Sequence, residues 1–173
     1  MRNKTIKKGI SILRAFKSHL GQSLIVFVIL LSFSACDDAL LFEENLKIAD
    51  SEWHRDEKAK FQFKVEDTTA SYDFYLNVRH GGEYPFKNLY LFTETRSPNG
   101  LLAVDTAQMI FADNSGRWMG KGIGGIYDYQ FKFKEKIEFP LRGEYTVEIE
   151  QGMREMVVPE LTDIGIRIEK SLE

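Results

Sequence analysis

The sequence lacks the residues that most disulfide, metal and hydrolase sites require. Cys36 is its only cysteine, so no disulfide can form within the chain. After Cys36 the histidines are His54 and His80, and neither has a thiol or another histidine at ligand spacing. A zinc site uses three or four such ligands, and the G-x-S-x-G turn of many serine hydrolases is also missing. We therefore expect no metal, no cofactor and no catalytic residue.

Long apolar runs are also missing. The longest, residues 24–33, is apolar except for Ser32 and has about ten residues, whereas a membrane-spanning helix needs roughly 20. Six basic residues and no acidic ones precede Cys36, and the small residues Ser34 and Ala35 stand directly before it. A basic start, a short apolar core and small residues at the cleavage site are typical of a secretory signal. We predict that residues 1–35 are a lipoprotein signal peptide.

Cys36 is then predicted to be the lipidated first residue of the mature protein, carrying diacylglycerol on its thiol and an acyl chain on its amino group. A single acyl chain binds a membrane only marginally, whereas two or more make attachment stable. Phe33 occupies the position where lipoprotein signals usually have leucine. The alternative is an ordinary signal peptide that leaves a free thiol, which is a liability outside the cytoplasm.

The part that follows the signal peptide is acidic. Residues 36–173 hold 17 of the 23 basic residues and all 26 acidic ones, a formal charge of −9. Such a domain has no electrostatic attraction for nucleic acids or for an anionic membrane surface. Its expected contact with the membrane is the covalent lipid. We assign residues 36–58 to the anchor and a tether, and residues 59–173 to one folded domain.

Helical periodicity is absent from that domain, and alternation of apolar and polar residues takes its place. Period-two patterns run through residues 61–65, 72–78, 127–133, 145–149 and 164–168, with turn residues between them. Such alternation is typical of strands with one buried face. Seven or eight short strands predict an all-β domain, an antiparallel two-sheet β-sandwich. The residues expected inside are Phe61, Phe63, Phe74, Leu76, Tyr129, Phe131, Val147, Ile149, Ile166 and Ile168.

Residues 113–125 connect a β-prone run, residues 101–111, with the pattern of residues 127–133 and contain five glycines. A phosphate-binding loop would lead into a helix, and here a strand pattern follows. A calcium loop of the EF-hand type would need a closing acid, which is missing. Two interpretations remain: a flexible connection with Trp118 and Met119 packed as a lid, or a docking loop. Hairpin connections of this length are uncommon, so we take Arg117, Trp118 and Lys121 as the candidate partner contact.

Several short blocks occur in one order along nearly the whole domain. They are residues 84–92, 105–106, 116–122, 151–154 and 163–170. As a set they resemble the GldH family of gliding-motility lipoproteins of the Bacteroidota. The resemblance implies a lipid-anchored component of the gliding apparatus, linked to adhesin secretion, with a structural or assembly role and no catalysis. It implies partners among the other envelope proteins of that machinery, and it maps the lipidated cysteine onto Cys36.

The resemblance places the protein in the cell envelope, with the outer membrane expected and the inner membrane facing the periplasm as the alternative. A second hypothesis is a surface glycan-binding lipoprotein, which would be favoured if Trp118 and Tyr75 lay coplanar on an open face. Buried rings would instead favour the assembly role. A third hypothesis, a glycoside hydrolase, would need a facing carboxylate pair such as Asp105 with Asp113 or Asp128.

Overall fold

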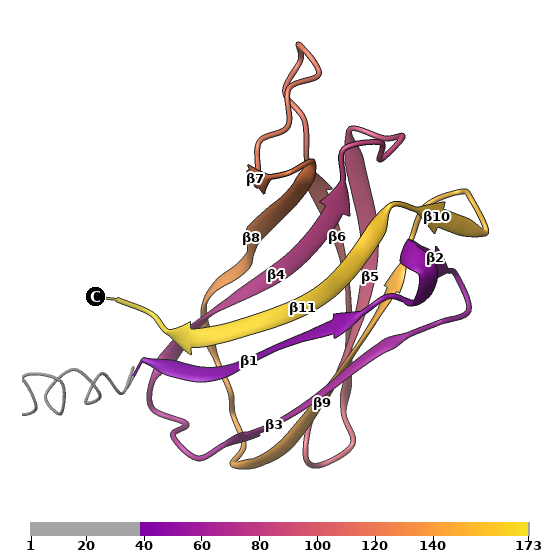
Figure 1. The fold of residues 1–173 in the computed structure, drawn as a ribbon. Helices are drawn as coiled ribbons and strands as arrows, with labels where there is room; N and C mark the ends of the chain where they lie inside the picture. Colours follow the sequence, from indigo (N-terminus) through magenta and orange to yellow (C-terminus); the bar gives the residue numbers. More distant parts are fainter. Residues whose placement is uncertain (1–38, 173) are drawn as a thin grey trace, which may run out of the picture. The chain divides into compact units, whose positions relative to one another are not determined.

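A computed structural model describes residues 39–172. The predicted signal peptide and Cys36 lie outside the described residues. Within residues 39–172, no helix is long and apolar enough to cross a membrane. The described part contains eleven strands and one short 3-10 helix (Figure 1). In order they are β1 (Leu40–Lys47), η1 (Ala49–Ser51), β2 (Glu52–His54), β3 (Ala59–Val65), β4 (Ser71–Gly81), β5 (Asn88–Arg96), β6 (Leu102–Ile110), β7 (Lys121–Ile123), β8 (Ile126–Glu138), β9 (Gly143–Gln151), β10 (Val157–Pro159) and β11 (Leu161–Lys170).

These strands form three antiparallel sheets. The orders are β1-β11-β4-β8-β7, β3-β9-β5-β6 and the small ribbon β10-β2. The prediction of an all-β antiparallel fold is confirmed. The predicted number of two sheets and seven or eight strands is wrong, because β2, β7 and β10 have only three residues each. Three residues are too few to show an alternating pattern in the sequence.

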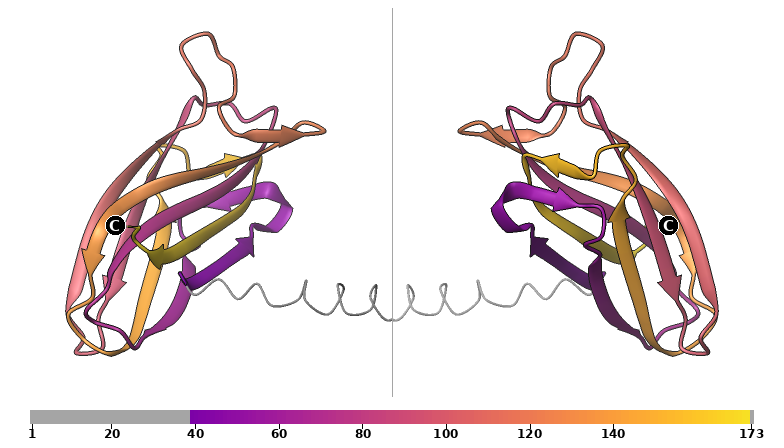
Figure 2. Two further views of the ribbon diagram at one scale, coloured as in Figure 1. Left: turned by 90° about the vertical axis from the view of Figure 1, so that its left-hand side faces the viewer. Right: turned by 90° about the vertical axis from the view of Figure 1, so that its right-hand side faces the viewer.

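The two larger sheets lie on either side of one hydrophobic core (Figure 2). In β3, Phe61, Phe63 and Val65 are buried while the residues between them are exposed. Eight of the ten residues predicted to be inside are buried. The other two, Tyr129 and Phe131, are partly buried and pack against the core. Alternation therefore identified the buried face correctly, because successive side chains of a strand point to opposite sides.

β1 lies inside the segment that the sequence assigned to a tether. It pairs with β11 along the edge of the five-stranded sheet, and the two strands run side by side in Figure 1. Phe42 and Leu46 pack against the core, and the ring of Phe42 lies 5.6 Å from that of Phe63. A bulge between Leu40 and Phe42 interrupts the register. Because three apolar residues are consecutive there, the sequence shows no clear alternation, and the strand was not predicted.

Candidate functional site

Residues 111–125 connect β6 with β8 and, with the start of β8, form two short hairpins, of which the first projects from the top of the domain in Figure 1 and the second extends sideways in Figure 2. The first closes through a bridge between Ala112 and Trp118. The second consists of β7 and the start of β8, with Gly124 and Gly125 at its turn. Both glycines have positive φ, +64° and +82°, which is the conformation that a type I′ turn requires. Residues 113–125, which in the sequence indicated one long loop, thus form two tight turns instead.

Asp113 organises the turn of the first hairpin. Its Oδ1 accepts hydrogen bonds from the Ser115 hydroxyl at 2.6 Å, the Ser115 amide at 2.9 Å and the Arg117 amide at 3.0 Å. Its Oδ2 accepts one from Arg117 Nε at 3.1 Å. These bonds, the one from the Ser115 hydroxyl foremost, lower the pKa of Asp113 to about 2. Both oxygens of the Asp113 carboxylate therefore stabilise the turn in which the residue lies. The described residues contain no group of three acidic, histidine or cysteine side chains that could hold a metal.

Trp118 attaches the first hairpin to the body of the domain. It is half-buried, and its ring lies edge-on to His80 with centroids 4.7 Å apart and 5.9 Å from the ring of Tyr127. His80 stacks in turn on Phe111, at 4.8 Å, at the other end of the same hairpin. Aromatic pairs at such distances stabilise a fold beyond the area that they bury. The structure thus places the Trp118 ring against the domain.

His80 is fully buried in this aromatic cluster. Its Nδ1 lies 2.9 Å from the carbonyl oxygen of Gly81, the distance of a hydrogen bond in which the ring donates. Burial lowers the pKa of His80, against weaker opposing effects of this bond and of Glu160. The imidazole is therefore neutral near pH 7, and it packs between aromatic rings as a flat, uncharged group.

Exposed apolar side chains lie at the end of the second hairpin and between the two hairpins. Ile123, which is 91% exposed, is paired across the second hairpin with the exposed Ile126, and Met119 is exposed between the hairpins. Arg117 extends from the first hairpin with 83% of its side chain exposed. The sequence reasoning missed Ile123 and Ile126, and Met119, which one interpretation packed as a lid with Trp118, is exposed. The Ile-Gly-Gly-Ile motif was the signal, since a two-residue type I′ turn makes its flanking residues cross-strand neighbours.

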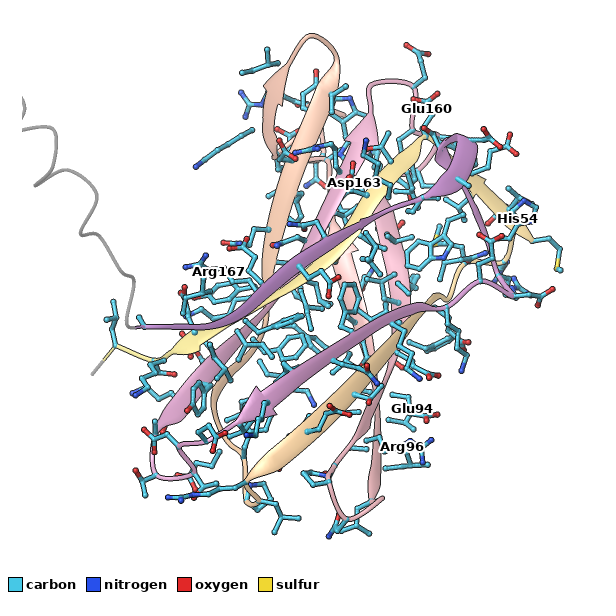
Figure 3. All side chains as sticks on the ribbon, turned by 60° about the horizontal axis from the view of Figure 1, so that its bottom comes forward. His54, Glu94, Arg96, Glu160, Asp163 and Arg167 are labelled. Carbon is cyan, nitrogen blue, oxygen red and sulfur yellow. The ribbon has the colours of Figure 1, made fainter. Side chains whose placement is uncertain are left out.

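Lys121 lies on β7 and lines a groove of about 670 Å³ on the outer face of the five-stranded sheet. Gly122 beside it is required, because a Cβ there would lie 2.5 Å from the Tyr127 ring. The cross-strand row through Lys121 alternates in charge, with Asp128 on β8, Arg79 on β4 and Asp163 on β11 as its next members. Figure 3 labels Asp163 and Arg167, which belong to this outer face of β11.

The charges of this row neutralise one another. Arg79 donates from Nε to Asp128 at 2.6 Å, and its Nη1 lies 3.5 Å from Asp163. The neighbouring row carries amides: Gln130 donates to Asn77 at 3.0 Å, and Asn77 lies 3.4 Å from Asn45. The outer face of the sheet is thus a network of satisfied polar groups.

The three predicted contact residues do not form one patch. Trp118 packs against the core side, Arg117 points outward from the first hairpin, and Lys121 belongs to the groove. Trp118 also shares no open platform with Tyr75. That ring lies on the outer face of β4, with the Lys132 ammonium 5.4 Å from its centre. By the criterion set from the sequence, the placement of the rings favours the assembly hypothesis over glycan binding.

The carboxylates considered for a hydrolase have separate partners. Asp105 pairs with Lys134 at 2.5 Å, Asp113 with the residues of its own turn, and Asp128 with Arg79. A glycosidase needs two carboxyl groups that face each other across the substrate. In the structure, each of these three carboxylates instead bonds to a different cation or amide.

Comparisons with known proteins agree on one family. A family model described as GldH lipoprotein matches residues 40–168. The chain is 34% identical over 162 residues to a gliding motility lipoprotein GldH homolog of Christiangramia forsetii, with 90% of this chain and 98% of that protein covered. It is also 34% identical over 157 residues to gliding motility lipoprotein GldH of Flavobacterium johnsoniae, covering 87% and 96%.

The similarity to solved structures is weak. A carbohydrate-binding module specific for non-crystalline cellulose aligns with a TM-score of 0.38 and 9% identity, covering 73% of this chain and 70% of that one. A score this low supports no conclusion about function.

Proposed function

The chain belongs to the GldH lipoprotein family, and from this premise we propose that it is a non-catalytic assembly component of the gliding machinery. It is a cell-envelope lipoprotein. The lipid is carried by Cys36, and the outer membrane is the membrane that holds it. The ion-paired carboxylates and the ordered hairpins support a binding role over a chemical one.

The distance between the anchor and the domain supports a position close to the membrane. Three residues, 37–39, separate Cys36 from the start of β1 at Leu40. A fully extended chain spans at most about 3.6 Å per residue, so this connection reaches no further than about 14 Å. The domain therefore stays beside the bilayer and meets partners at the membrane surface.

The two hairpins between β6 and β8 are the proposed contact with another envelope protein of the machinery. The observation that carries this proposal is the exposure of Ile123, at 91%, on a hairpin next to one that is anchored by the packing of Trp118 on His80. Exposed apolar patches rimmed by polar residues mark interaction sites, and the residues that dominate binding are most often Trp, Tyr and Arg. Lys121 lies on the same hairpin as Ile123, Arg117 extends from the first hairpin, and Trp118 holds the first hairpin in position.

Colony spreading tests this proposal when it is measured together with stability. Ile123→Asp in the full-length protein places a charge at the tip without removing a buried contact. We expect spreading to fall while the melting temperature and the amount of protein in the membrane fraction stay unchanged. The matched control is Met156→Asp, at another exposed apolar residue far along the chain, which should spread normally. Normal spreading of Ile123→Asp, or equal loss in both variants, would reject the contact.

A further inference from the structure

The edge of the four-stranded sheet at β6 is unusually open. Among the described residues, β6 pairs with β5 alone, over nine residues and without a register shift. It contains no proline, lysine or arginine. Its one charged residue, Asp105, is neutralised by Lys134 of β8 at 2.5 Å. Proteins normally protect edge strands with charges, proline, bulges or short length, because unpaired backbone groups invite another strand.

The other edges of the two larger sheets carry such protection. β3 has exposed Lys60 and Lys64 along its length. β1 has a bulge between Leu40 and Phe42 and the acidic residues Glu43 and Glu44. β7 is only three residues long and covers only residues 126–128 of β8. The rest of β8 carries Lys132, Lys134 and Lys136, and its pairing with β4 is interrupted by bulges. Of these edges, β6 is therefore the one that is long, regular and almost free of charge.

Exposed apolar side chains accompany this edge. Leu102, Val104 and Ile110 of β6 are all exposed, Val104 by 70%. Tyr90 and Phe92 of the neighbouring β5 are also about 40% exposed, and they lie opposite Gln108 and Thr106 of β6. Contiguous apolar patches on a soluble domain mark interaction surfaces. The patch and the open edge coincide.

The charges beside the patch are already balanced. Glu94 and Arg96, which Figure 3 labels on β5, form an ion pair at 3.0 Å. They stand opposite Val104 and Leu102 of β6. A strand that approaches this edge therefore meets apolar side chains and no net charge.

We propose that β6 pairs antiparallel with β6 of a second copy of this chain, with the two-fold axis at Thr106. In this register Leu102 faces Ile110 of the second copy, Val104 faces Gln108, and Thr106 faces its own counterpart. Asp105 faces Ala107, so no like charges are opposed. Each apolar residue at the ends of β6 gains an apolar neighbour, and cross-strand pairs of this kind stabilise a sheet. The interface is isologous, as a two-fold dimer requires.

Neighbouring registers fit less well. With the axis at Asp105, the two Asp105 carboxylates would stand directly opposite each other, which is destabilising. With the axis at Ala107, Leu102 would lie opposite residue 112, outside β6. A shift by a single residue would place the apolar face of one strand against the inner face of the other. The strand is thus complementary to itself in one register. In that register its one charged residue, Asp105, does not meet its own counterpart, and we therefore take a second copy of the chain as the partner.

Cysteine cross-linking in the cell envelope tests the pairing, using the full-length protein and a mild oxidant. Thr106→Cys should give a disulfide-linked dimer, because the two side chains meet at the axis. Val104→Cys alone should give none, since the two copies of residue 104 lie four positions apart, about 13 Å along the strands, beyond the reach of a disulfide. Val104→Cys expressed together with Gln108→Cys should restore the dimer. Gln62→Cys, exposed in the middle of β3, is the matched control and should stay monomeric.

A second change tests the open edge itself. Val104→Lys in the Thr106→Cys background should abolish the disulfide-linked dimer, because lysine protects an edge against pairing. Three outcomes would overturn the proposal: no dimer from Thr106→Cys, equal dimer from Gln62→Cys, or a disulfide to a different protein. The pairing does not depend on the role of the β6–β8 hairpins, so either proposal can fail without the other.

Discussion

The indole of Trp118 meets the imidazole of His80 edge to face, with centroids 4.7 Å apart and planes inclined at 62°. His80 belongs to β4, in the middle of the five-stranded sheet. The same imidazole stacks on Phe111, where the first hairpin begins. One buried, neutral side chain thus supports both ends of the first hairpin.

Stability should therefore depend on pH through His80. Burial lowers its pKa in the folded state below the ordinary value of 6.5. Below about pH 6.5 the unfolded chain binds a proton that the folded chain excludes, so the free energy of unfolding falls as the pH falls. One proton gives a slope of at most about 1.4 kcal/mol per pH unit. Urea denaturation between pH 7.5 and pH 5 measures it.

His80→Phe should remove this part of the slope, because phenylalanine keeps a stacking ring but has no proton to bind. His54, which is exposed, provides the control: His54→Asn should keep the slope of the parent. If the His80→Phe protein shows the same slope as the parent, the pH dependence arises elsewhere and the assignment to His80 is wrong.

Trp118→Ala should reduce stability as well as spreading. Truncating a fully buried aromatic residue costs roughly 3–5 kcal/mol, and Trp118 is half-buried, so we expect a loss of about 2 kcal/mol. Trp118→Phe should recover part of it through the remaining contact with His80. Chemical denaturation and membrane-fraction abundance are the measurements. An unchanged free energy of unfolding would show that the ring does not anchor the hairpin.

Gly165→Ala should weaken the attachment of β1. A Cβ at Gly165 would lie 2.0 Å from the Asn45 side-chain oxygen and 2.6 Å from the carbonyl oxygen of Glu44. Overpacking of this kind costs about 1–3 kcal/mol. We expect lower stability and faster hydrogen exchange along β1 than along β4.

A variant at Asn45 shows how much of that clash comes from the Asn45 side chain and how much from the Glu44 carbonyl oxygen. Asn45→Ala alone should change stability by less than about 0.5 kcal/mol, as is usual for a surface residue. Combined with Gly165→Ala it should restore only part of the loss, since the Glu44 carbonyl still blocks the added carbon. Full restoration by the double variant would show that the backbone contact is unimportant.

Cys36→Ser should abolish the lipid anchor. The peptidase that cleaves lipoprotein signals acts on the lipid-modified cysteine, so the variant should accumulate as an uncleaved precursor or as a soluble form. Fractionation and the apparent mass on a gel report the result. A protein of mature size that still partitions with membranes would contradict lipidation at Cys36.

Much of the fold could be predicted because alternation in a strand is a local property. Phe61 and Phe63, or Ile166 and Ile168, alternate with polar residues in sequence, and the structure buries all four. The sequence did not predict β1 or the three-residue strands β2, β7 and β10. A segment that is this short, or whose apolar residues are consecutive, shows no alternation, and it forms a strand only by pairing with a neighbouring strand. β1 needs β11, and β7 needs β8.

For the candidate site, the sequence by itself determined the composition of the 113–125 segment and the family resemblance, because residue identities and their order are sufficient for both. It could not determine which way the Trp118 ring faces. That depends on His80, 38 positions earlier in the chain, being buried beneath the first hairpin. The tertiary structure likewise decided that β6 lies at an edge. The position of a strand in its sheet is set by which distant strands pair, and pairing between residues far apart in sequence leaves no local pattern.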